Sequence, residues 1–174
     1  NLAMLYNNRL LMHQSALKLL NEHRFSETYR EPWRWDYAMA QTQIYMHEQG
    51  KAMTLLDSII RPENNISYDI YATRGYLHLS MQQLQPALRD LTQAKQLSLK
   101  NATDSTDYYR MAGNIAFIYA QTDDCANAVN TLNACIRFAE TNNNDIDAAI
   151  YHRKRAKIYL ACGNTAAATA DYKT

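Results

Sequence analysis

Residues 71–78, YATRGYLH, and residues 84–94, LQPALRDLTQA, decide the fold of this 174-residue chain. In the second segment the small residue Ala87 is followed four positions later by the large Leu91. Gly75 stands twelve positions before Ala87, in the first segment. Residues spaced by three or four positions share one face of a helix. The pattern predicts two helices that approach closely at the small residues, with the large residue filling the groove between them.

The same arrangement recurs along the chain at intervals of 35 to 41 residues. The small residue of the second helix forms a column of alanines: Ala16, Ala52, Ala87, Ala128 and Ala168. A large residue stands four positions after each of them: Leu20, Leu56, Leu91, Leu132 and Tyr172. The residue twelve positions before is also small in the last three units: Gly75, Ala116 and Ala156. A single helix pair cannot bury both of its faces, so the pattern predicts a stack of pairs.

The composition favours an all-α chain. Alanine occurs 24 times and valine once, and no alternating run of strand length stands out. Helical periodicity and breaks at proline, glycine and capping residues predict nine helices, over residues 2–22, 33–48, 51–60, 68–82, 86–99, 105–121, 124–141, 145–162 and 165–173. Gly50 and Gly163 are expected to take the left-handed conformation that closes a helix.

These units resemble the tetratricopeptide repeat. The resemblance is clear over residues 67–104, 105–144 and 145–174, and loose over residues 1–66, where the repeats are degenerate. It implies a single domain over residues 1–174, built as a right-handed α-α superhelix of antiparallel helix pairs. Because the chain starts at Asn1 and the last unit is cut short, we expect it to be a piece of a longer protein.

Charge and cysteine content narrow the possible partners. The chain has 18 Lys and Arg against 17 Asp and Glu, which argues against a nucleic-acid or anionic-membrane partner for this segment. No apolar run is long enough to span a bilayer, so the segment is expected to be soluble. The three cysteines, Cys125, Cys135 and Cys162, are too few and too scattered for a disulfide framework, and their odd number slightly favours a reducing, cytoplasmic location.

No pattern in the sequence indicates catalysis. The five histidines never pair at helical spacing, and no His-Glu-x-x-His motif is present, so a metal site is not expected. Glycine is too rare for a loop that cradles phosphate. Cys135 is expected to replace the small core residue of its unit. The sequence therefore predicts neither an enzyme nor a cofactor.

The resemblance implies a concave groove lined by the first helix of each pair. The expected partner-binding residues are Asp69, Tyr76, Ser80, Arg110, Phe117, Gln121, Arg153 and Lys157. Two aromatic rings would anchor an apolar group, and the three cations would pair with an acidic or carboxylate-bearing protein or peptide. In the alternative interpretation the rings pack against neighbouring helices and the charges are only solvated.

Some relatives of this kind clamp the terminal carboxylate of chaperones with a set of Asn and Lys residues. At the equivalent groove positions this chain has Ala72, Tyr76, Gly113 and Phe117, so a chaperone co-factor role is not expected. The dense basic run of residues 152–157 spreads around its helix, so no single face presents all of it. Arg155 stands where the repeat normally has an apolar residue, and it is expected to pair with Asp171 or with a downstream element.

Three functions remain open at this level. The first is a non-enzymatic scaffold that binds a protein or peptide in its groove. The second is a sensory or regulatory segment of a larger signalling or transcription-regulating protein. The third is a structural spacer or a module for self-association.

Overall fold

The computed structural model describes residues 13–23, 33–61, 67–100 and 106–173. Within these ranges the secondary structure is helical throughout, which confirms the all-α prediction. The nine helices of these ranges are α2 (His13–His23), α3 (Trp33–Tyr45), α4 (Gln49–Ile59), α5 (Tyr68–Ser80), α6 (Leu84–Lys100), α7 (Thr106–Gln121), α8 (Cys125–Thr141), α9 (Asp145–Ala161) and α10 (Thr165–Asp171). Each follows one of the nine predicted segments; residues 2–12 of the first lie outside the described residues.

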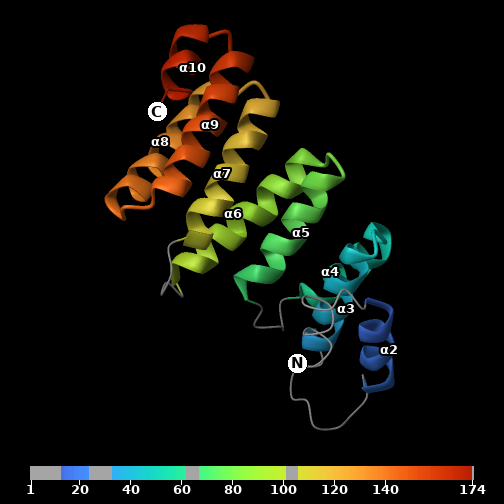
Figure 1. The fold of residues 1–174 in the computed structure, drawn as a ribbon. Helices are drawn as coiled ribbons and strands as arrows, with labels where there is room; N and C mark the ends of the chain where they lie inside the picture. The colour runs from blue at the N-terminus through green and yellow to red at the C-terminus, as the bar shows by residue number, and fades with distance from the viewer. Residues whose placement is uncertain (1–12, 24–32, 62–66, 101–105, 174) are drawn as a thin grey trace.

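The helices pack as successive antiparallel pairs along the chain (Figure 1). The pairs are α3 with α4, α5 with α6, α7 with α8 and α9 with α10, and α2 packs on α3. Neighbouring pairs contact each other through α4 and α5, α6 and α7, and α8 and α9. The first helices of two successive pairs, α7 and α9, also lie side by side. This arrangement is the predicted stack of helix pairs.

The column of alanines forms the centre of each contact. Four of the five alanines, all except Ala168, have no exposed surface, and Ala168 is 1% exposed. The large residues Leu20, Leu56, Leu91 and Leu132 are fully buried as well. Tyr172, the fifth, is 52% exposed, so the expectation that it fills a groove is wrong. It is the C-cap residue of α10 and lies beyond the last helical turn that packs on α9.

Within the described residues, five short turns between successive helices each contain one left-handed residue. These residues, with positive φ, are His47, Gln82, Asp123, Asn143 and Gly163. Gly163, with φ of 78°, closes α9 as predicted. The expectation for Gly50 is wrong, because Gly50 lies in the first turn of α4 and His47 supplies the left-handed residue before it. Polar residues tolerate this conformation in tight turns, so glycine is not required there.

Side-chain caps follow three of these turns. Asp124, Asn144 and Asn164 accept hydrogen bonds from the backbone N–H groups three residues ahead, at 3.2, 3.1 and 3.1 Å. Each bond satisfies one of the free donors in the first turn of α8, α9 or α10. The starts of α8, α9 and α10 are therefore each capped by the residue that follows the left-handed one, whereas Glu48, which follows His47, makes no such bond.

Two arginines make the same buried network two pairs apart. Arg74 donates two hydrogen bonds to the carboxylate of Asp90, at 2.7 and 2.8 Å, and a third to Asp57 of the preceding pair, at 2.8 Å. Arg74 lies one position before the small Gly75 of its helix, and Asp90 lies three positions after Ala87.

Arg155 occupies the equivalent position before Ala156. It donates to Asp171 at 2.8 and 2.6 Å and to the Asn133 side chain of the preceding pair. Asp171 also bonds His152, with 3.0 Å between oxygen and Nδ1. The prediction that Arg155 pairs with Asp171 is confirmed, and the pairing links neighbouring repeats as well as neighbouring helices.

Replacing Gly75 by leucine is expected to overpack the contact between α5 and α6. A Cβ atom at this position would lie 2.9 Å from the Leu91 Cγ and 3.2 Å from the Leu91 backbone nitrogen. Because a backbone atom cannot move away freely, the free energy of unfolding should fall by about 1–3 kcal/mol in urea denaturation. The matched control is Gly50→Leu, where a Cβ atom would meet nothing within 4 Å. An equal loss of stability in both variants would contradict this account.

Replacing Arg155 by methionine is expected to destabilise the protein at neutral pH. The Arg155 guanidinium holds the pKa of the Asp171 carboxyl below its ordinary value, so this contribution to stability is present above that value and is lost as pH falls through the depressed pKa. The variant should lose about 2–3 kcal/mol at neutral pH, because the buried carboxylate loses its charged donors. The difference from the parent should shrink as the pH falls below the ordinary pKa of an aspartate and through the lowered pKa of Asp171, because protonation then weakens the pair in the parent too. Arg153→Met, an exposed residue of the same helix, should leave stability nearly unchanged.

Candidate functional site

The candidate site lies between α7 and α9, on the face that these helices turn away from the core. The buried residues Met111, Ile115 and Ile118 of α7 pack in one cluster with α5 and α6, and Ala112 and Ala116 pack with α8 and α9. This leaves Phe117 and Gln121 exposed beside α9. The period of the helix therefore separates a packing face from a face that is free to meet a ligand.

A pocket of about 240 Å³ opens between these two helices. Helix α7 contributes Gly113, Asn114, Phe117, Ala120 and Gln121 to its lining. Helix α9 contributes Lys154, Lys157, Ile158 and Ala161. Both charged residues of this lining are lysines, and none of the lining residues is acidic. The pocket thus combines an apolar wall with positive charge.

Lys154 is the more enclosed of the two cations. It is half-buried, whereas Lys157 is exposed. Its ammonium lies against the backbone of α7: a Cβ atom at Gly113 would be 3.3 Å from the Lys154 Nζ and 3.2 Å from the Tyr151 Cε1. The same Nζ lies 5.9 Å from the centroid of the Tyr151 ring. Burial lowers the pKa of Lys154, since removing water disfavours the charged form.

Three of the eight predicted groove residues come together in this pocket. Phe117, Gln121 and Lys157 all line it. Arg153 is exposed on α9 and does not contribute to the lining. Asp69 and Ser80 lie on α5 outside the pocket; Asp69 is half-buried, and the Ser80 hydroxyl donates to the Leu77 carbonyl at 2.7 Å. The predicted set is thus distributed along three helices, with a concentration at α7 and α9.

Tyr76 lies on α5 as part of the packing between helices. Its ring is half-buried against the apolar cluster that includes Leu91 and Ile115. Burial raises the pKa of its hydroxyl above the ordinary value. Only part of this ring can meet a ligand, in contrast to Phe117, which is 48% exposed.

Arg110 forms a salt bridge with a residue of its own helix. Its guanidinium lies 2.6 Å from the carboxylate of Asp107, one turn earlier. Tyr68 of α5 donates a hydrogen bond to the same carboxylate at 2.5 Å, and this bond raises the pKa of Tyr68 to about 12. The charge of Arg110 is therefore partly neutralised, and the trio ties α5 to α7.

Sequence reasoning missed four residues of the pocket: Asn114, Lys154, Ile158 and Ala161. The expected face of α9 ran through Arg153 and Lys157, and Lys154 lies one position further around the helix. Gly113 was the available signal, because a glycine inside a helix is costly and often marks close approach of another group. The basic run of residues 152–157 spreads around its helix, as predicted. His152 and Arg155 bind Asp171, Lys154 and Lys157 line the pocket, and Arg153 is exposed outside it.

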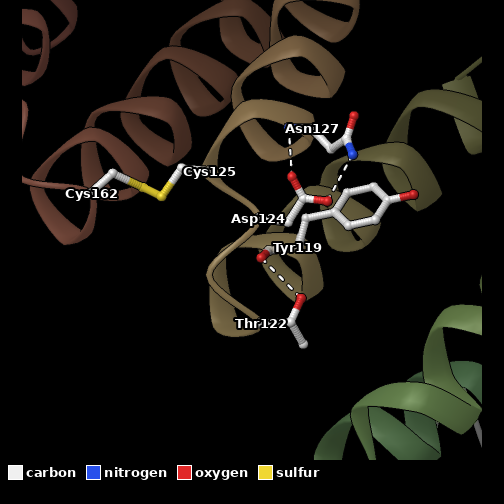
Figure 2. Close-up of a disulfide and its surroundings, with 6 residues drawn as sticks. All are labelled: Tyr119, Thr122, Asp124, Cys125, Asn127 and Cys162. Atoms are coloured by element: carbon white, nitrogen blue, oxygen red, sulfur yellow. Dashed lines mark hydrogen bonds between the residues drawn. A yellow bond between two sulfur atoms is a disulfide. The ribbon is translucent and has the colours of Figure 1, made fainter.

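The three cysteines are too few and too scattered for a disulfide framework, but two of them form a disulfide. Cys125, the first residue of α8, forms a disulfide with Cys162, which follows the last residue of α9, and their Cα atoms are 6.2 Å apart (Figure 2). The spacing along the sequence is 37 residues, but the antiparallel packing of α8 and α9 brings these two helix ends to one edge. Disulfides of this kind persist in oxidising surroundings, so the argument from the odd count for a reducing compartment does not hold.

The remaining cysteine is a packing residue. Cys135 is fully buried in the cluster between α7, α8 and α9, as expected for the small core position. Burial raises the pKa of its thiol to about 11, which keeps it protonated and a poor nucleophile near neutral pH. Among the residues that the structure describes, no group of three or more His, Cys, Asp or Glu side chains could hold a metal ion. In the same residues, no helix is long and apolar enough to cross a membrane.

Comparison of the coordinates with solved structures identifies the architecture. Kinesin light chain TPR-like repeats from Podosopora anserina superpose with a TM-score of 0.79 at 16% identity, over 99% of this chain and 89% of that one. The fold is that of tetratricopeptide-like repeat proteins. BtubC from P. vanneervenii matches with a TM-score of 0.83 at 15% identity, over 99% of this chain and 74% of that one. YrrB, a TPR protein with an unusual peptide-binding site, matches with a TM-score of 0.70 at 14% identity, over 97% and 78% of the two chains.

No family model and no curated protein sequence matches the chain. The similarity to these solved structures therefore lies in the arrangement of helices, at overall identities of 14–16%.

Removal of the disulfide is expected to lower stability while leaving the fold intact. The double variant Cys125→Ser, Cys162→Ser should lose about 2–4 kcal/mol in its free energy of unfolding, because the unfolded chain regains the freedom that the bridge restricts. Alkylation under denaturing conditions, followed by mass spectrometry, tests the pairing directly. The unreduced parent should take up one label, on Cys135, and the reduced parent three. Three labels without reduction would contradict the bridge.

Proposed function

We propose that this chain is a non-enzymatic protein-interaction module that holds a peptide or partner domain in its concave groove. One observation carries the proposal: the pocket between α7 and α9 joins an exposed aromatic ring, an apolar wall and two lysines without an acidic residue in its lining. Apolar pockets with a few polar groups of one kind are typical of binding sites. The partner that fits such a lining carries apolar side chains next to negative charge.

Phe117 is the main anchor in this proposal. An aromatic ring that is 48% exposed in the free protein gains by burial against a partner, and aromatic residues of this kind contribute much of the binding energy at interfaces. Lys157, which is exposed on α9 and lines the pocket, would guide an acidic partner toward the groove. Arg153 does not line the pocket and has no part in this proposal. Arg110 contributes less, because Asp107 already offsets its charge.

Replacing exposed residues of the pocket lining is expected to remove a specific partner in an affinity-capture experiment. The bait is the parent chain, compared with the triple variant Phe117→Ala, Gln121→Ala, Lys157→Glu. All three residues are exposed, so the variant should fold like the parent, which thermal unfolding checks. A direct partner should bind the variant at least about tenfold more weakly, as expected for loss of an aromatic anchor and reversal of a charge.

The matched control is Leu99→Ala, which removes an exposed apolar side chain from α6, outside the pocket. It should capture the same proteins as the parent. Equal capture by the parent and the triple variant would contradict a role for this face. Light scattering on the parent checks self-association, and a dimer that forms at rising concentration and is lost in the triple variant would instead identify a second copy of the chain as the partner.

A further inference from the structure

Lys154 is a half-buried cation with no carboxylate in ion-pair contact among the described residues, although Asp147 acts on its charge from further away. No hydrogen bond or ion pair joins it to any residue of the ranges 13–23, 33–61, 67–100 and 106–173. The Tyr151 ring and the backbone at Gly113 lie close to it, and neither carries a full negative charge. A desolvated charge is unfavourable unless a partner of opposite sign is supplied.

The two half-buried arginines of the described chain are paired, whereas its other half-buried lysine, Lys95, lies with its Nζ 5.2 Å from the centroid of the Tyr108 ring, outside the pocket. Arg74 and Arg155, with side chains 18% exposed, each make two hydrogen bonds to an aspartate of the same repeat. Lys157 and Arg153 are exposed, so water solvates them. Lys154 therefore differs from both arginines, because it faces a pocket instead of a carboxylate, and from Lys95, because it lines that pocket.

We infer that Lys154 recognises a carboxylate, that of an aspartate or glutamate side chain on the peptide which the proposed function assigns to the groove. The inference rests on that function and specifies its ligand. An acidic side chain entering at Gly113 and Asn114 would meet the ammonium where no protein side chain competes for it. Because the site is partly closed to water, the resulting ion pair is stronger than one at the surface.

The length of the pocket also sets the spacing of the ligand groups. Its lining continues from Gly113 and Lys154 to Ala120 and Ala161, seven positions further along each helix. At 1.5 Å per residue this separation is about 10 Å. An extended peptide rises about 3.3 Å per residue, so the two ends of the pocket are about three peptide residues apart. The ligand therefore carries an acidic side chain and an apolar side chain three positions from each other.

A side-chain carboxylate fits this pocket better than a terminal one. A free C-terminus is usually held by several donors that converge on it, and the Asn and Lys set that does so in some relatives is not reproduced at Ala72, Tyr76, Gly113 and Phe117. Lys154 is a single point charge, which suffices for one carboxylate on a flexible side chain.

Three immobilised libraries of short peptides test the inference. The first carries a fixed glutamate with a leucine three positions away in either direction and an amidated C-terminus. The second replaces the glutamate by glutamine, and the third keeps the glutamine but has a free C-terminal carboxylate. The probes are the parent, Lys154→Met, Gly113→Ala and the matched control Arg153→Met, which removes a charge from an exposed position on the same helix.

The parent should retain the first library at least about tenfold more strongly than the second. Lys154→Met should remove this preference, and Arg153→Met should preserve it. Gly113→Ala should reduce it without changing any charge, because the new methyl group would push against the Lys154 Nζ and the Tyr151 ring. Thermal unfolding of each variant verifies that the loss is not a loss of folding.

Several results would overturn the inference. Equal retention of the first two libraries by the parent, or equal loss in Lys154→Met and Arg153→Met, would show that Lys154 does not read a carboxylate. Strong retention of the third library would assign the ligand to a chain terminus instead. If peptides bind without any preference for glutamate but are lost from the Phe117 triple variant, the inference fails while the proposed function stands. If the parent retains no library, the inference fails and the capture experiment alone decides the proposed function.

Discussion

The close approach of helices at small residues is the constraint on which the rest of the structure depends. Ala87 and Gly75 show it most clearly, because the Gly75 backbone lies so near Leu91 that even a methyl group would collide with it. Tight contact of this kind fixes the distance and angle between the two helices of a pair. Repeated along the chain, it also fixes how one pair stacks on the next, and so determines which residues of α7 and α9 face each other across the pocket.

Buried arginine–aspartate networks also stabilise the packing of one helix pair on the next, in every second pair. The networks of Arg74 and Arg155 use equivalent positions, and each reaches back to a polar residue of the preceding pair, Asp57 or Asn133. A bidentate arginine fixes geometry as well as distance, which apolar contacts do not. The consequence for function is a division of labour among the basic residues of α9. Arg155 is committed to packing between repeats, so Lys154 is the enclosed cation that remains available to a ligand.

Sequence periodicity was sufficient for the helices and for the alanine column, because both depend on contacts between residues close together in the repeat. Sequence periodicity did not predict the disulfide or the pocket lysine, because both depend on which helices lie next to each other in the folded chain. The bridge between Cys125 and Cys162 requires knowing that the start of α8 and the end of α9 share an edge. Lys154 was missed because the expected groove face included Arg153, the preceding residue of α9, which is exposed outside the pocket. The left-handed turn was assigned to Gly50 instead of His47 because polar residues also adopt this conformation.

The disulfide affects both the stacking of the last repeats and the geometry of the pocket. It joins the residue after α9 to the first residue of α8, and the pocket ends beside it at Ala161 and Gln121. A covalent link at this edge restrains the end of α9 relative to the turn that follows α7, since only Thr122, Asp123 and Asp124 separate α7 from Cys125. A groove whose walls are fixed before binding has less conformational entropy to lose when a peptide enters. The bridge therefore contributes to the geometry of the pocket as well as to the stability of the last repeats, although neither cysteine lines the pocket.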